Sequence, residues 1–236
     1  MAALRSHEMR FPSETRRYRA ARNRLLEAER DLRKRVEQVA VLRRKLPLGG
    51  QIPEDYVFEE GATDLADAKT VRAVRLSDLF REGLDTLVVY SFMFDLNMKQ
   101  ACPMCTSFID SLNGTAPHFE QRANLAVVAK SPINRLRDFA RGRAWSHLRL
   151  LSSAHSTYNR DYHGESPEGG QVPSLNVFVR RAGKIHHFYH TELVFLPGDR
   201  GQNQRHIDMA WPLWNLLDFT PEGRGTDWFP RLSYKK

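Results

Sequence analysis

Helical periodicity dominates the first fifth of the chain. Residues 13–46 contain neither glycine nor proline, and apolar side chains recur there every seven positions. These are Tyr18, Leu25, Leu32, Val39 and Leu46. The spacing predicts a helix about 50 Å long, at ~1.5 Å per residue, with a narrow apolar stripe along one face. A stripe of this kind cannot form a core by itself, so we expect it to pack on its own domain or to form a homodimer with a second copy of the helix.

The remainder of the chain alternates between strand and helix patterns. Two continuous apolar runs, residues 86–92 and 124–130, are typical of strands buried inside a sheet. Apolar residues at helical spacing follow each run and predict helices over residues 102–113 and 132–143. We expect the first of these helices to end at Asn113-Gly114. The order predicts a βαβ unit, which requires a parallel sheet with right-handed crossovers.

Weaker patterns complete the prediction. Residues 145–151 are expected to form a further short strand, and residues 174–180 and 184–191 a β-hairpin. A last helical segment, interrupted by Pro212, covers residues 208–219. The predicted fold class is α/β, with a central mixed sheet flanked by helices and a long N-terminal helical arm.

Breaker residues divide the chain into three regions. The run from Pro47 to Gly50 ends the helical arm, which we assign to residues 1–50. The α/β domain is expected over residues 51–219, and residues 220–236 are expected to be a polar and aromatic tail packed on its surface.

The net charge of +8 belongs to the arm. Residues 1–46 contain 14 Lys and Arg against 6 Asp and Glu, whereas the rest of the chain contains 22 of each. Arginine and glutamate alternate along the arm, which is typical of a solvated helix face, so nucleic acid is not an expected partner. No apolar run approaches the roughly 18 residues of a membrane span, and the first 11 residues do not resemble a secretory signal. We therefore expect no membrane partner and a cytoplasmic location.

The chain has two cysteines, Cys102 and Cys105, three positions apart at the start of a predicted helix. A thiolate is the nucleophile in disulfide exchange, and the N–H groups at a helix N-terminus favour the anion. A second thiol one turn later can attack a mixed disulfide formed at the first. The pattern predicts Cys102 as the nucleophile and Cys105 as the resolving thiol.

Two other interpretations of the pair stay open. The cysteines could be inert core residues, although a proline between them at a helix start is not needed for that role. They could also bind a metal, but a tetrahedral site needs four ligands, and no histidine has a clear ligand spacing to them. The histidines considered are His118, His147, His155, His163, His186, His187 and His190. Strand alternation places His186 and His190 on one face of the hairpin and His187 on the other. We expect no cofactor.

The chain resembles the thioredoxin superfamily through its strand, its Cys-Pro-Met-Cys motif and the segment that starts at Val172-Pro173 and ends at Gly183-Lys-Ile185. It resembles more closely one uncharacterised thioredoxin-like branch, domain of unknown function 899. The matching segments are residues 18–29, 89–94, 158–162 and 217–224. The resemblance covers nearly the whole chain.

The resemblance implies a thioredoxin-like fold and a dithiol site. It implies that Pro103 and Met104, between the cysteines, and Val172 and Pro173, before the hairpin, contact the substrate, with Pro173 in the cis form facing the dithiol. Asp95 is the nearest candidate for the buried carboxylate that assists the resolving thiol in this superfamily. The segment with Tyr158, Asn159, Asp161 and Tyr162 could either line a substrate cleft beside the thiols or pin its own loop by hydrogen bonds.

Three functions compete at this stage. The first is a thiol-disulfide oxidoreductase that acts on a disulfide-containing protein or a small thiol substrate and is restored by a cellular dithiol reductant. The second is a peroxiredoxin-like thiol peroxidase, in which Cys102 forms a sulfenic acid that Cys105 resolves. Lys99 and Gln100 stand where peroxiredoxins have a threonine, which counts against the peroxidase. The third is a non-enzymatic module that binds a metal through Cys and His or binds a partner.

Overall fold

The computed structural model describes residues 9–198, 200, 208–225 and 227–234 of the chain. The chain divides into two compact units, Met1–Pro47 and Leu48–Lys236. The division falls close to the boundary that we expected after residue 50, and the C-terminal tail belongs to the second unit.

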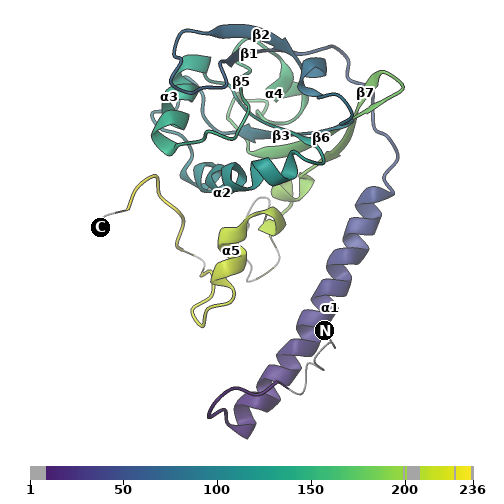
Figure 1. The fold of residues 1–236 in the computed structure, drawn as a ribbon, viewed down its shortest axis with the longest axis vertical. Helices are drawn as coiled ribbons and strands as arrows, with labels where there is room; N and C mark the ends of the chain where they lie inside the picture. The colour runs from purple at the N-terminus through teal and green to yellow at the C-terminus, as the bar shows by residue number, and fades with distance from the viewer. Residues whose placement is uncertain (1–8, 199, 201–207, 226, 235–236) are drawn as a thin grey trace. The chain divides into compact units, whose positions relative to one another are not determined.

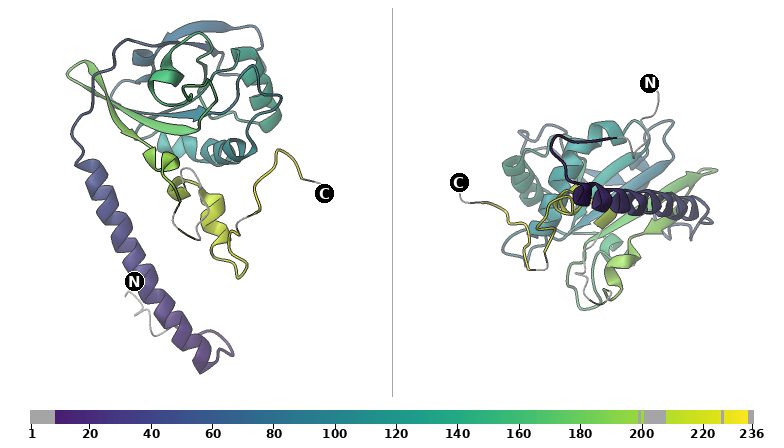
Figure 2. Two further views of the ribbon diagram at one scale, coloured as in Figure 1. Left: turned by 180° about the vertical axis from the view of Figure 1, so that it is seen from behind. Right: turned by 90° about the horizontal axis from the view of Figure 1, so that it is seen from below.

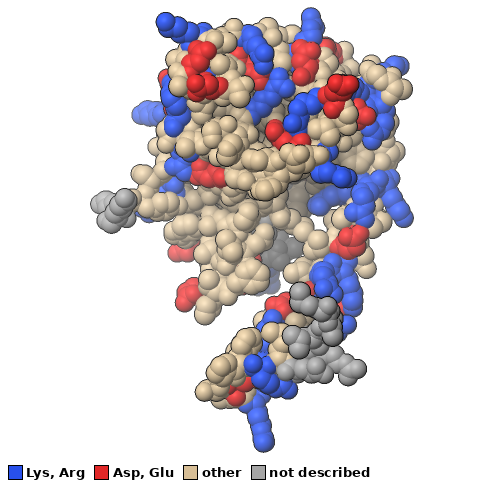
Figure 3. All heavy atoms as spheres, viewed as in Figure 1, with Lys and Arg blue, Asp and Glu red and all other residues tan. Residues whose placement is uncertain are grey.

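The described part of the first unit contains one long helix, α1 (Arg16–Arg44). Thr15 caps it, because the Thr15 hydroxyl accepts the backbone N–H of Tyr18 at 3.1 Å. The apolar stripe is exposed, with Leu25 at 52% and Leu32 at 64% of full exposure. Lysine and arginine side chains are interspersed with acidic ones along α1 (Figure 3). The sequence pattern therefore produced the predicted helix.

The second unit is built on a seven-stranded sheet with the order β2-β1-β5-β4-β3-β6-β7. Its strands are β1 (Val57–Gly61), β2 (Val71–Arg75), β3 (Thr86–Phe92), β4 (Asn124–Ala129), β5 (Leu150–Ser152), β6 (Ser174–Arg181) and β7 (Lys184–His190). The neighbours β3, β4 and β5 are parallel, whereas β6 is antiparallel to β3 and β7 is antiparallel to β6. The run β4-β3-β6-β7 is the core arrangement of the thioredoxin-like fold, which confirms the predicted fold class.

Helices cover the sheet and join its strands (Figures 1 and 2). The α-helices are α2 (Pro103–Phe119), α3 (Ile133–Arg143), α4 (Tyr158–Asp161) and α5 (Pro212–Leu217). The 3-10 helices of the described ranges are η2 (Leu76–Leu79), η3 (Glu192–Phe195) and η4 (Asp208–Ala210). The last predicted helical segment, residues 208–219, is thus divided into η4 and α5, and Pro212 occupies the first turn of α5, where its missing N–H would have no helical partner.

The side chains of β3 alternate between two cores. Tyr90 and Phe92 pack with residues of α2, α3 and α5, whereas Leu87 and Val89 pack on the other face with Tyr158 of α4. Because both faces are covered, the strand needs apolar residues on each side, which explains its continuous apolar run. The sheet therefore separates a face that carries α2 from a face that carries α4.

Helix α2 runs five residues beyond the end expected at Gly114, to Phe119. Pro117 lies inside the helix and has no N–H to donate to the carbonyl of Asn113 one turn earlier. His147 lies 3.3 Å through its Nδ1 from that carbonyl, and the backbone N–H of His147 donates to the Asn113 side chain at 3.0 Å. The prediction of a stop was wrong because Asn113 is used in these contacts with the segment after α3.

The strand expected over residues 145–151 is shorter, because β5 contains only Leu150–Ser152. Ala144 ends α3 in the left-handed conformation, and Trp145 is buried beneath α3 with its indole N–H donating to Asp110 at 2.8 Å. The C-terminal tail contacts the same region, since Arg143 donates to the carbonyl of Leu232 at 3.0 Å. In the described ranges, no helix combines the length and the apolar character that crossing a membrane requires.

Candidate dithiol site

The two cysteines lie where β3 meets α2. After β3, residues 93–101 form a loop, and the backbone N–H of Cys102 donates to the carbonyl of Met93 at 3.1 Å. Arg135 of α3 holds this loop, because its guanidinium donates to the carbonyls of Asp95 and Met98 and lies 4.2 Å from the centre of the Phe94 ring. The loop is therefore held by Arg135 of α3, and the start of α2 is held by the hydrogen bond from Cys102 to Met93.

Cys102 is the N-cap of α2. Its backbone is extended, with φ −61° and ψ 120°, and its sulfur accepts the backbone N–H of Cys105 at 3.5 Å. Pro103 follows at the first helical position, where it leaves the N–H groups of the next residues free to face the cap. The Cys102 carbonyl accepts both the backbone N–H and the hydroxyl of Thr106, at 2.9 and 2.8 Å. The Cys102 sulfur thus lies at the positive end of the helix and is half-buried.

Cys105 is fully buried and faces the core on the α2 side of the sheet. Its thiol is hydrogen-bonded to the Cys102 sulfur, to the Tyr90 hydroxyl and to the backbone N–H of Met93. Both cysteines are free thiols. The pair is therefore asymmetric, with one sulfur near the surface and the other enclosed among protein groups.

This asymmetry separates the acidities of the two thiols. The hydrogen bond from the Cys105 thiol, together with the backbone N–H groups of Cys105 and Met104, lowers the pKa of Cys102 to about 6, against the opposing effect of burial. Burial, followed by the hydrogen bond to Cys102 and the charge on Cys102, raises the pKa of Cys105 well above its ordinary value. At neutral pH the pair therefore carries one thiolate, on Cys102, and one thiol, on Cys105.

Four residues predicted to contact substrate lie at the same edge of the sheet as Cys102. Pro103 and Met104 are half-buried in the first turn of α2. Val172 and Pro173 are also half-buried and directly precede Ser174, which pairs with Ser91 near the end of β3. The backbone hydrogen bond from Cys102 to Met93, just after β3, places the start of α2 at the end of β3. The pairing of Ser174 with Ser91 places Val172 and Pro173 at the same end.

The expected cis form of Pro173 is wrong, because the described residues contain no cis peptide bond. The backbone N–H of Val172 donates to the carbonyl of Gly164 at 3.0 Å, and Gln171 forms an antiparallel bridge with Glu165. These contacts carry the chain into β6 already extended. The trans form, which is the favoured form of such bonds, fits this path.

The segment with the Tyr-Asn-Arg-Asp-Tyr sequence lies on the other face of the sheet. Tyr158 and Asn159 are fully buried, and Tyr158 and Tyr162 pack in the core opposite α2. The Asn159 side chain accepts the Ser153 hydroxyl at 2.7 Å and donates to Gln171 at 3.3 Å. Asp161 accepts the hydroxyl of Tyr56 at 3.0 Å. The structure thus separates these four residues from the dithiol and shows the hydrogen bonds that pin their loop.

Sequence reasoning missed Tyr90 as the polar group at Cys105. Asp95, the carboxylate proposed for this role, accepts the backbone N–H groups of Asn97 and Met98 at 2.8 and 3.0 Å and so stabilises a turn in the loop. A signal for Tyr90 existed in the sequence, because a tyrosine in a strand buried on both faces needs a partner for its hydroxyl. Cys105 supplies that partner.

Within the described ranges, no three His, Cys, Asp or Glu side chains converge in an arrangement that could hold a metal ion. The hairpin histidines also differ from the strand prediction. A β-bulge between Val177 and Phe178 pairs Phe178 with His187 and leaves an extra residue on β7, so that His187 and His190 line one pocket.

Comparison with known proteins adds the following. AhpC of Enterococcus faecalis is similar at 9% sequence identity and a TM-score of 0.48, and the match covers 73% of this chain and 92% of that chain. The reduced 2-Cys peroxiredoxin of Plasmodium vivax is similar at 15% identity and a TM-score of 0.47, with 73% of this chain and 96% of that chain covered. Thioredoxin peroxidase I of Plasmodium yoelii is similar at 19% identity and a TM-score of 0.45, with 80% of this chain and 100% of that chain covered. A search of the curated proteins returned no match. At these identities the chemistry of the chain must be argued from its own residues. The family model for bacterial proteins of unknown function DUF899 matches residues 9–234, and the chain therefore belongs to the DUF899 family.

Proposed function

We propose that the chain is a cytoplasmic thiol-disulfide oxidoreductase in which Cys102 is the nucleophile and Cys105 the resolving thiol. One observation carries the proposal. The half-buried sulfur at the N-cap of α2 has a lowered pKa, and a fully buried thiol one helical turn later donates a hydrogen bond to it. This combination supplies an attacking thiolate near the surface and a second thiol within reach of it.

In the first step, the Cys102 thiolate attacks one sulfur of a substrate disulfide. A bond forms between Cys102 and that sulfur, the substrate disulfide breaks, and the other substrate sulfur leaves as a thiolate. The substrate gains the electron pair of the broken bond. The Thr106 contacts to the Cys102 carbonyl hold the nucleophile in its cap geometry during this step.

The second step becomes easier once the first has occurred. The charge on Cys102 and the hydrogen bond to its sulfur are two of the causes that raise the pKa of Cys105, and both disappear when Cys102 is in a mixed disulfide. The hydrogen bonds from Tyr90 and Met93 remain and lower the pKa of Cys105. Cys105 then loses its proton to solvent and attacks the Cys102 sulfur, which releases the second substrate thiolate and forms the intramolecular disulfide. A cellular dithiol reductant restores the pair.

Contact with the substrate falls to the residues around the half-buried sulfur. Pro103 and Met104 on one side, and Val172 and Pro173 on the other, border the end of β3 where Cys102 lies. We assign them to binding of a disulfide-containing protein or a small disulfide.

Trapping of the mixed disulfide tests the proposal. The Cys105→Ser variant should accumulate covalent adducts with disulfide substrates, because the second step is blocked. The adducts should be released by reductant and should be absent from the matched double variant in which Cys102 is also serine. If the Cys105→Ser variant forms no adduct with a model disulfide under conditions in which the wild-type chain becomes oxidised, the assignment of Cys102 as nucleophile is wrong.

A thiol peroxidase is the second candidate. The same pair can react with a peroxide, because the Cys102 thiolate can accept an oxygen to give a sulfenic acid and an alcohol or water, and Cys105 can condense with it to release water. The observation that favours this function is the hydrogen-bonded contact between the two sulfurs, which places the resolving thiol beside the site of oxidation. Rates of peroxide consumption and disulfide reduction, measured on one sample, distinguish the two candidates.

We further propose that two copies of the chain associate through α1. Its apolar positions repeat every seven residues, and Tyr18, Leu25, Leu32 and Leu46 are exposed, so they are open to the same stripe of a second copy.

A further inference from the structure

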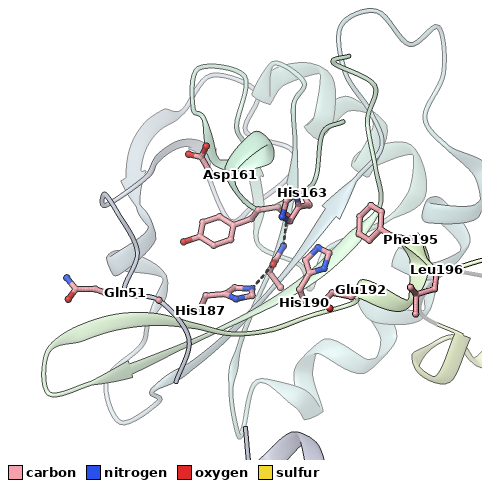
Figure 4. A pocket seen from close by; sticks show the side chains of 11 residues that line it. Gln51, Asp161, His163, His187, His190, Glu192, Phe195 and Leu196 are labelled. Carbon is pink, nitrogen blue, oxygen red and sulfur yellow. Dashed lines mark hydrogen bonds between the residues drawn. The ribbon is translucent and has the colours of Figure 1, made fainter. Parts of the chain in front are cut away.

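A pocket separate from the dithiol site lies on the face of the sheet opposite α2. Its volume is about 570 Å³, within the range of ordinary small-molecule sites. Strands β6 and β7 form its floor through Asn176, His187 and His190, and the segment after α4 and η3 form its walls. Figure 4 shows the side chains of His163, His187, His190 and Phe195 gathered around this space. The proposed redox reaction uses none of these residues.

His190 is the unusual member of the pocket. It is only 7% exposed, and neither of its ring nitrogens has a hydrogen-bond partner among the residues that the structure describes. Burial, together with the neighbouring His163 and His187, lowers the pKa of His190 to about 4, so the ring is neutral at physiological pH. A neutral imidazole offers one N–H donor and one lone pair, and no group among the described residues takes up either of them.

The other polar groups at the floor are satisfied. The amide of Asn176 donates to the carbonyl of Tyr162 at 3.2 Å, and a carbonyl can only accept. The Asn176 oxygen therefore remains for His187, whose Nε2 lies 3.0 Å away and must donate. His187 is thus held as a neutral ring in one tautomer, and burial lowers its pKa as well. The contrast identifies His190 as the group left for a ligand.

The walls of the pocket are flat aromatic surfaces. Tyr162 and His187 are stacked, with ring centres 5.4 Å apart and planes at 30°. His190 and Phe195 are also stacked, at 5.6 Å and 17°. His163 meets His190 edge-on, at 5.8 Å and 76°. Surfaces of this kind favour a planar ring that can stack against them.

The charge of the described lining disfavours an anionic ligand. Among the described residues that line the pocket there is no lysine or arginine, whereas Asp161 and Glu192 both line it. From these residues an anion would meet two carboxylates and no compensating cation, while His187 and His190 are neutral.

From these observations we infer that the pocket binds a neutral, planar heteroaromatic molecule that forms a hydrogen bond with a ring nitrogen of His190 and stacks against its aromatic walls. The ligand site is independent of the dithiol, because the sheet lies between them. Loss of Cys102 should therefore leave binding unchanged, which keeps a failure of this inference separate from a failure of the proposed redox function.

Benzimidazole is a suitable probe, because it is planar, is neutral at pH 7.5 and has one donor and one acceptor nitrogen. Titration calorimetry with the full-length chain should give a Kd below about 1 mM, the range expected for a ligand of this size. Benzimidazole-5-carboxylate, which adds a negative charge, should bind at least ~10-fold more weakly, and naphthalene, which lacks the polar atoms, should also bind more weakly. Titration should move the ring nitrogen signals of His190 in spectra of histidine-labelled protein.

Two variants test the residues. His190→Phe keeps the stacked ring but removes both nitrogens, and it should weaken binding of benzimidazole at least ~10-fold. Phe195→Ala removes a half-exposed aromatic wall of the pocket, and it should weaken binding several-fold without changing the melting temperature. His155→Phe, at an exposed histidine outside the pocket, is the matched control and should bind as the wild type does.

The inference fails if benzimidazole does not bind at several millimolar, if the carboxylate binds equally well, or if the His190 signals do not move. It also fails if a folded His190→Phe chain, or the Phe195→Ala chain, binds benzimidazole as tightly as the His155→Phe control does.

Discussion

Removing the Cys105 thiol should raise the pKa of Cys102. The hydrogen bond from the Cys105 thiol is the largest cause of the lowered pKa of Cys102, ahead of the backbone N–H groups of the helix start. The Cys105→Ala variant deletes this donor and leaves the helix start in place. The Cys105→Ser variant is the matched control, because its hydroxyl occupies nearly the same position and can still donate.

The size of the effect follows from the strength of the lost bond. A hydrogen bond to a charged group contributes about 1.5–3 kcal/mol, and one pKa unit corresponds to ~1.4 kcal/mol. The pKa of Cys102, about 6 in the wild type, should therefore rise by about 1–2 units in Cys105→Ala. In Cys105→Ser it should stay within about half a unit of the wild-type value.

The assay is the rate of alkylation of Cys102 as a function of pH, because only the thiolate reacts. The pKa of Cys102 is lowered, so its reactivity is present above that pKa and is lost as the pH falls through it; in the wild type, half of the limiting rate should be reached near pH 6. Peptide mapping confirms which sulfur carries the label. If Cys105→Ala titrates within about 0.3 units of the wild type, the hydrogen bond between the sulfurs does not set the acidity, and the reasoning is refuted.

Three further changes have defined outcomes. Tyr90→Phe removes a hydrogen bond that lowers the pKa of Cys105, so the pKa of Cys105 should rise by about 1 unit. Release of thiol from a mixed disulfide on Cys102 should then slow by up to ~10-fold. An unchanged release rate in stopped-flow measurements would contradict the role of Tyr90. Gly61→Ala would place a Cβ 2.5 Å from the buried Arg137 side chain and should lower the free energy of unfolding by about 1–3 kcal/mol. Gly114→Ala, which has open space around it, should raise that free energy by about 0.5–1 kcal/mol. Equal effects of the two variants in chemical denaturation would show that the contact with Arg137 does not matter. Leu32→Glu in the apolar stripe of α1 should shift the chain from dimer to monomer in sedimentation, and a wild-type chain that is already monomeric would disprove the association.

Much of the fold followed from local patterns. The continuous apolar runs of β3 and β4 and the helical spacing of α3 predicted their types and their bounds within a residue. These elements were predictable because burial on both faces or along one stripe leaves a periodic signal in the sequence.

The errors came from contacts between distant residues. Asn113-Gly114 has the composition of a helix stop, but α2 continues past it. His147 contacts the Asn113 carbonyl, which has no N–H partner at Pro117, and also the Asn113 side chain. The cis form of Pro173 was inferred from a resemblance, whereas the bridge between Glu165 and Gln171 sets the path of this chain. No local pattern reports such contacts.

The position of the two cysteines at a helix start was predictable, because it follows from a buried strand, a proline after Cys102 and the apolar spacing of the next residues. The hydrogen bond from Tyr90 to Cys105 was harder to predict, because it depends on the packing of β3 against α2, which is a tertiary contact. The pocket around His190 could not be predicted at all. The bulge in β7 that brings His187 and His190 to one face breaks the alternation from which their positions were inferred.

The proposed function depends on the reversible formation of a disulfide between Cys102 and Cys105. The most direct measurement of this disulfide is the intact mass of the alkylated chain across buffers of graded dithiol and disulfide content. We expect a single two-electron transition, from a chain that takes two alkyl groups to a chain that takes none. A chain that keeps both thiols free in the oxidising buffers, or that retains a small-molecule adduct on Cys102 instead of closing the pair, would contradict it.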